Sequence, residues 1–147
     1  MENAFERQGT LVAEINSALP SGEREQKAAQ LPALNLAYIG DTVFDLYVRT
    51  MLVTRADAKV HELHLMSAAR VCAKGQAEGF RKIEPMLSEE EMSVYKRGRN
   101  SHLGTVAKNA TISDYRTATG LEALIGYLYL TGQDARLKEL MKIILEH

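Results

Sequence analysis

The chain has 147 residues, 46% hydrophobic and 25% charged, which predicts one folded domain and excludes a disordered segment. Its single cysteine, Cys72, excludes an internal disulfide and favours a reducing compartment, and neither an apolar run of ~20 residues nor a signal-peptide pattern indicates a membrane or export. The 18 Lys and Arg against 19 Asp and Glu give a net charge of −1, which by itself argues against nucleic-acid binding, because such proteins usually carry a basic excess.

The hydrophobic pattern is helical along nearly the whole chain, and no alternating run indicates a β-strand. Apolar residues recur at helical spacing over 4–19, and a polar stretch follows over 23–30. A long helix is expected over 33–53. Because this segment is apolar on several faces, we expect it to be central and buried.

A third helix is expected over roughly 57–79. Asp57 is a good N-cap residue for its start, and Gly79 suits its end. His61 and His64 lie three residues apart, but no cysteine or second histidine pair completes a tetrahedral zinc site. We therefore interpret both histidines as ordinary polar residues of the helix.

A capping box marks the next helix. Ser88 is followed three positions later by Glu91, a pattern that predicts a helix start, and the helix is expected over 89–97. Gly98 suits the position just after its end. Residues 98–110 are expected to form a loop with at most one helical turn.

Two more helices are expected at the end of the chain, over 115–130 and 133–145, separated by Gly132. The whole pattern predicts an all-α fold of about six to seven helices. Four further side chains are expected in or near the core: Tyr38, Tyr47, Cys72 and Tyr129.

The charge is unevenly distributed. Residues 84–91 hold four acids and no base, whereas residues 96–116 hold five bases and one acid, so the second window carries +4. Arg, Lys and Asn on a glycine-containing loop are groups that contact phosphates and sugars, although a solvated polar loop has the same composition. The candidate phosphate-binding residues are Lys96, Arg97, Arg99, Asn100, Lys108 and Asn109.

Asp41 and Glu122 are isolated acids within strongly apolar helices. Burying a carboxylate costs several kcal/mol unless it is paired or binds a metal. Two such acids on neighbouring helices can converge on Mg²⁺, which one or two carboxylates commonly hold together with water. Alternatively, each acid pairs with an arginine such as Arg49 or Arg116, or caps a neighbouring helix.

Four segments in this order resemble the Mini-ribonuclease III family, small bacterial members of the ribonuclease III family that lack a double-stranded-RNA-binding domain. The segments are LNLAYIGDTVFDLYVR (34–49), KRGRNS (96–101), AKNA (107–110) and YRTATGLEALIGYLYL (115–130). The resemblance implies a ribonuclease III-like endonuclease domain over 31–145, preceded by an N-terminal helical extension over 1–30. Residues 146–147 could be the remnant of a tag.

The resemblance also implies an activity and its partners. We expect a symmetric homodimer, with helix 33–53 supplying part of its surface, that uses Mg²⁺, or Mn²⁺ as a substitute, to hydrolyse double-stranded RNA. The products carry 5′-phosphate and 3′-hydroxyl ends. The implied substrate is the 23S ribosomal RNA precursor in the bacterial cytoplasm, presented by a large-subunit ribosomal protein.

By resemblance, Asp41 and Glu122 are the catalytic and metal-binding residues. The longer family members carry four acids, and the two other positions hold Ala37 and Thr119 here. The Thr119 hydroxyl could complete the metal shell. Asp45, one turn after Asp41, could orient a metal-bound water, or it could equally be buried or paired with an arginine.

The reduced set of acids leaves a second hypothesis, a catalytically weak RNA-binding module for ribosome assembly on the same fold. Retention of both Asp41 and Glu122 argues against it, because a scaffold has little use for buried acids. A generic helical interaction protein would leave these acids and the basic window unexplained.

Overall fold

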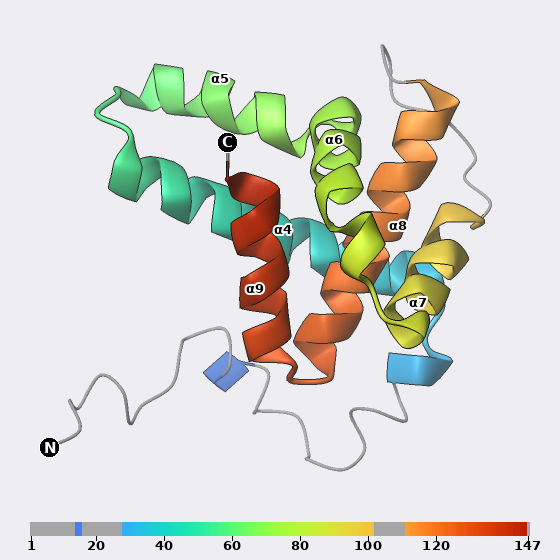
Figure 1. The fold of residues 1–147 in the computed structure, drawn as a ribbon. Coiled ribbons are helices and arrows are strands. Elements are labelled where there is room, and N and C mark those ends of the chain that lie inside the picture. Colours follow the sequence, from blue (N-terminus) through green and yellow to red (C-terminus); the bar gives the residue numbers. More distant parts are fainter. Residues whose placement is uncertain (1–13, 16–27, 102–110, 147) are drawn as a thin grey trace, which may run out of the picture.

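The computed structural model describes residues 14–15, 28–101 and 111–146, and within these ranges the regular structure is helical, as predicted. None of the described helices is long and apolar enough to cross a lipid bilayer. The elements labelled in Figure 1 begin at residue 33, so most of the expected extension over 1–30 lies outside the described residues. In chain order they are α4 (Ala33–Arg55), α5 (Val60–Val71), α6 (Ala73–Ile83), η1 (Glu84–Met86), α7 (Glu89–Arg99), α8 (Ile112–Leu130) and α9 (Asp134–Leu145).

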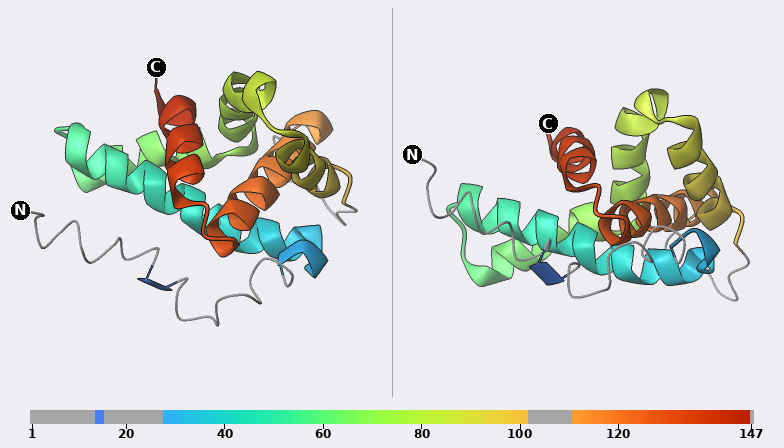
Figure 2. Two further views of the ribbon diagram at one scale, coloured as in Figure 1. Left: turned by 60° about the horizontal axis from the view of Figure 1, so that its bottom comes forward. Right: turned by 90° about the horizontal axis from the view of Figure 1, so that it is seen from below.

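Helix α8 is the central element. It contacts α4, α6, α7 and α9, and from Ala118 to Tyr129 every residue except Glu122 is buried. Helix α4 lies along one side of α8, whereas α6, α7 and α9 cover other sides (Figures 1 and 2). A helix surrounded in this way must be apolar on all faces, which explains why its sequence lacks a polar side.

Helix α4 is not buried on all sides, contrary to the prediction for 33–53. One face packs on α8, but Tyr38 on the other face is 83% exposed, and Leu34 and Val53 are also exposed. The described residues leave this outer face uncovered. Of the three tyrosines predicted in or near the core, only Tyr129 is buried; Tyr47 is half-buried.

The single helix expected over 57–79 is two helices. The chain breaks at Cys72, whose extended backbone ends α5 and begins α6, and its Sγ accepts a hydrogen bond from the Gly75 N–H at 3.5 Å. Cys72 is therefore an exposed capping residue and not a core residue. Lys59, not Asp57, precedes α5, and Gly79 lies inside α6.

Helix α7 begins as predicted but ends later. The Ser88 hydroxyl accepts a hydrogen bond from the Glu91 N–H at 3.1 Å, and the Glu91 carboxylate accepts one from the Ser88 N–H at 2.9 Å. Gly98 does not end the helix, which continues to Arg99 with Asn100 as its C-cap. The remainder of the predicted loop, over 102–110, lies outside the described residues.

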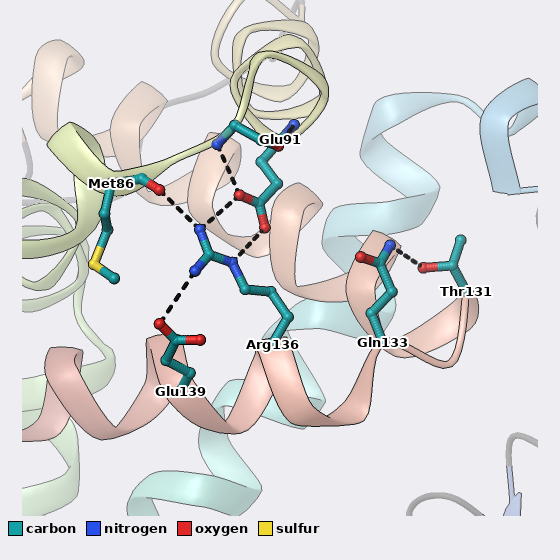
Figure 3. A network of polar contacts seen from close by, with 7 residues as sticks. Met86, Glu91, Thr131, Gln133, Arg136 and Glu139 are labelled. Atoms are coloured by element: carbon teal, nitrogen blue, oxygen red, sulfur yellow. Dashed lines mark hydrogen bonds and ion pairs between the residues drawn. The ribbon is translucent and has the colours of Figure 1, made fainter.

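The last two helices are joined by a tight turn. Helix α8 starts three residues earlier than expected, because the Thr111 hydroxyl accepts a hydrogen bond from the Asp114 N–H at 3.0 Å. Gly132 breaks the chain with φ +70°, which a residue with a Cβ adopts only at a cost. Arg136 in the first turn of α9 then binds Glu91 in the first turn of α7, so the starts of the two helices are tied together (Figure 3).

Candidate active site

Helices α4 and α8 cross at two glycines. A Cβ atom on Gly40 would lie 1.8 Å from the carbonyl oxygen of Glu122, and one on Gly126 would lie 1.9 Å from the carbonyl oxygen of Leu36. No side chain fits at either position, so the two backbones are in direct contact. This contact brings Asp41, the residue after Gly40, next to Glu122.

Asp41 and Glu122 form an acid pair at this crossing. Burial, and then the negative charge of Asp41, raise the pKa of Glu122 to about 8. At neutral pH Glu122 therefore mostly keeps its proton. Asp41 itself is exposed, which corrects the expectation that it is buried.

Among the described residues, no arginine forms an ion pair with either acid. The ion pairs among the described residues include neither Asp41 nor Glu122. Arg49 binds Asp45 instead, with Nε 3.0 Å from Oδ2, and Arg116 is exposed on α8. Of the alternatives for Asp45, the structure thus shows pairing with an arginine. For Asp41 and Glu122, the described residues show no such pair.

Of the two other positions in the family's set of acids, only Thr119 offers a side-chain oxygen, and its part in a metal shell stays a prediction. The Thr119 hydroxyl donates a hydrogen bond to the Tyr115 carbonyl at 3.0 Å, and Ala37 offers no ligand atom. His61 and His64 are exposed on α5, and the described part of the chain holds no group of three potential metal ligands. The donor set is therefore two carboxylates, which fits Mg²⁺ with water in its remaining positions.

The basic end of α7 packs beside the acid pair. A Cβ atom on Gly98 would lie 2.7 Å from the Ala123 Cβ and 2.9 Å from the Gly120 Cα. This second glycine crossing holds the last turn of α7 against the turn of α8 that carries Glu122. Sequence reasoning assigned Gly98 only a role in ending the helix and missed this packing role.

The predicted phosphate-binding residues differ in their surroundings. Lys96 is exposed on α7. Arg97 is also exposed, but its Nη2 donates a hydrogen bond to the Leu31 carbonyl at 2.7 Å, which ties the segment just before α4 to α7. Lys108 and Asn109 lie outside the described residues.

Arg99 has two contacts, one with an aromatic ring and one with a neighbouring amide. Its guanidinium carbon lies 5.7 Å from the centroid of the Tyr95 ring, and its Nε donates a hydrogen bond to the Asn100 Oδ1 at 3.2 Å. Sequence reasoning missed Tyr95, although its spacing of four residues from Arg99 places both on one helix face.

The chain matches one family across this site. Residues 34–133, which include Asp41, Glu122 and the basic window from Lys96 to Arg116, match the family model for the ribonuclease III domain. The chain belongs to the ribonuclease III family. As a ribonuclease III family member it is an endoribonuclease.

Similar proteins agree with this assignment. A Mini-ribonuclease 3 of Clostridium tetani is 46% identical over 122 residues, which cover 82% of this chain and 81% of that protein. A Mini-ribonuclease 3 of Enterococcus faecalis is 47% identical over 114 residues, which cover 76% of this chain and 86% of that protein. A crystal structure of a Fusobacterium nucleatum protein has a TM-score of 0.73 at 30% identity and covers 79% of this chain and 93% of that one.

Proposed function

We propose that this endoribonuclease cleaves double-stranded RNA in a Mg²⁺-dependent reaction, with Asp41 and Glu122 holding the metal. The acid pair carries the proposal, because two adjacent carboxylates that form no ion pair with a described basic residue favour a divalent cation. The bound ion would activate a water and stabilise the charge that develops on the phosphodiester, leaving 5′-phosphate and 3′-hydroxyl ends. Mn²⁺ would serve as a substitute.

The chain's own residues have distinct tasks in this proposal. Glu122 would give up its proton on binding a cation, because the cation would take over the stabilisation that the proton supplies. Lys96 and Arg99 bind phosphates beside the acid pair, and Lys108 and Asn109 extend the contact. A-form RNA presents a shallow minor groove lined with 2′-hydroxyls, so recognition would depend mostly on shape.

The proposed substrate is the 23S ribosomal RNA precursor in the bacterial cytoplasm, cut at both strands by a symmetric homodimer. Exposed apolar residues on α4 and α5 support the dimer, among them Tyr38 and Leu65. The net charge of −1 implies weak binding of duplex RNA by the chain alone. A large-subunit ribosomal protein that presents the precursor would compensate for this weakness.

Cleavage of a short RNA duplex tests the proposal. We expect cleavage with Mg²⁺, none with EDTA, and a loss of at least about 100-fold in Asp41→Asn, because a neutral amide binds the cation more weakly than a carboxylate. Duplex binding should remain. Asp57→Asn, at an exposed acid between α4 and α5, is the matched control and should cleave normally.

Undiminished cleavage by Asp41→Asn would contradict the proposed site. Binding without cleavage of any duplex, including the ribosomal precursor with its ribosomal protein, would favour the RNA-binding assembly module instead.

A further inference from the structure

Tyr95 is the middle of an aromatic stack that connects the core with the basic end of α7. Its ring lies 3.9 Å from the Phe80 ring at an interplanar angle of 14°, and both side chains are buried, with 4% and 2% exposed. The guanidinium of Arg99 lies over the same Tyr95 ring. A surface arginine is thus placed on a platform that belongs to the core.

The platform itself cannot shift easily. A Cβ atom on Gly120 would lie 2.5 Å from Cε2 of Tyr95, so the ring fits against the bare backbone of α8. Phe80 holds the ring from α6, and Tyr95 is itself part of α7. Three helices therefore hold the Tyr95 ring in place, and the ring contacts α8 at Gly120, two residues before Glu122.

We propose that Tyr95 is a positioning residue that holds the Arg99 guanidinium ready for a phosphate of the RNA substrate beside the acid pair. This inference rests on the proposed function, since it takes Arg99 to contact RNA. Free arginine side chains occupy many rotamers and lose that freedom on binding. An arginine already held on an aromatic ring loses less, and its two Nη groups, which the Asn100 bond does not use, stay available for paired phosphate oxygens.

A double-mutant cycle tests the coupling of the two residues. Binding of a short RNA duplex is measured in EDTA, so that no strand is cut, for Arg99→Ala, Tyr95→Leu and the double variant. We expect Arg99→Ala to weaken binding about tenfold and Tyr95→Leu about threefold. The double variant should bind no more weakly than Arg99→Ala, because the tyrosine acts only through the arginine.

Tyr95→Phe is the conservative control, since phenylalanine keeps the ring that the guanidinium covers. It should bind within about twofold of the original chain. Arg99→Ala should also flatten the dependence of log K on log salt by about one phosphate contact, whereas a purely structural defect has no reason to do so. If the double variant lost as much duplex affinity as the product of the two single losses, the positioning role of Tyr95 would be overturned.

Arg99→Lys keeps the inference testable if Tyr95→Leu does not fold. Lysine keeps the charge but lacks the planar group that stacks on a ring, so binding should weaken about threefold or more at an unchanged salt slope. Affinity equal to that of the original chain would overturn the inference. Should Arg99→Ala bind normally while Asp41→Asn still abolishes cleavage, the arginine contact fails and the proposed active site stands.

Discussion

Glu91 and Glu122 are both largely removed from water, yet their pKa values move in opposite directions. The Arg136 guanidinium donates hydrogen bonds to the two Glu91 oxygens at 2.8 and 2.9 Å, and these bonds lower the pKa of Glu91 despite its burial (Figure 3). Burial and the neighbouring Asp41 raise the pKa of Glu122. The partner of a buried acid therefore distinguishes a structural carboxylate from one suited to a cation.

Replacing Glu91 with Gln should destabilise the fold by about 1–3 kcal/mol at pH 7, because the half-buried Arg136 loses its ion pair with the buried carboxylate. The lowered pKa means that this contribution is present above the ordinary value of 4.5 and is lost as the pH falls through the folded-state value. Urea unfolding at pH 7 and pH 3 measures this effect. The difference in the free energy of unfolding between Glu91→Gln and the original chain should be smaller at pH 3.

Glu139→Gln is the matched control, because Glu139 pairs with the same arginine at 3.3 Å but its side chain is 54% exposed. The Glu139→Gln change should lower the free energy of unfolding by less than about 1 kcal/mol. If the free energy of unfolding differed between Glu91→Gln and the original chain by the same amount at both pH values, the ionised pair would not be the source of the difference.

At the scale of helices, glycines decide which residues meet. Gly40 and Gly126 let α4 touch α8, and Gly98 and Gly120 let α7 touch α8. The first crossing joins Asp41 to Glu122, and the second adds the basic end of α7. A close approach of backbones thus brings together groups that are far apart in the sequence.

Gly40→Ala tests the first crossing. In an exposed helix this change would stabilise by about 1 kcal/mol, since alanine has the higher helix propensity. Here the added Cβ would lie 1.8 Å from the Glu122 carbonyl oxygen, so α4 must move away from α8. We expect the free energy of unfolding, measured by thermal unfolding, to fall by about 2–3 kcal/mol. Duplex cleavage should also fall strongly.

Thr42→Ala, at an exposed position on the same helix, is the control and should change stability by less than about 0.5 kcal/mol. A Gly40→Ala chain that is more stable than the original and cleaves normally would show that the two helices need no backbone contact.

At the scale of the whole molecule, apolar side chains remain on the surface. They lie mainly on α4 and α5, where Tyr38 is 83%, Val53 and Val60 are 68% and Leu65 is 61% exposed. Apolar surface of this kind on a small protein marks an interaction site more often than chance placement. It is the surface that the proposed homodimer would bury.

Light scattering tests the dimer. The mass of one chain is 16.3 kDa, and we expect about twice this value in solution. Tyr38→Glu should shift the mass toward that of one chain, because a charge would be buried at the contact. Circular dichroism should show unchanged helix content.

Ile112→Glu provides the comparison, since Ile112 is 59% exposed at the start of α8, on a different helix from the apolar residues of α4 and α5. It should remain a dimer. A mass near 16.3 kDa for the unaltered chain would contradict the proposed assembly.

Local features could be predicted from the sequence because they depend on few neighbouring residues. The Ser88 capping box and the turn at Gly132 each form within a short segment, and both are where the sequence places them. Asp41 and Glu122 were also identifiable as rare charges in apolar helices. Their match to a known family pattern needed no knowledge of contacts.

Contacts between distant segments decided which helix faces are buried and which residues meet. The sequence of α4 is apolar on several faces, but only packing shows that one face meets α8 and leaves Tyr38 exposed. A glycine can end a helix or admit a neighbour, and the position of α8 decides that Gly98 does the second. The sequence pattern predicted the helices and their acids, whereas the backbone contacts at the glycine crossings placed the acids and the basic end of α7 on the same part of α8.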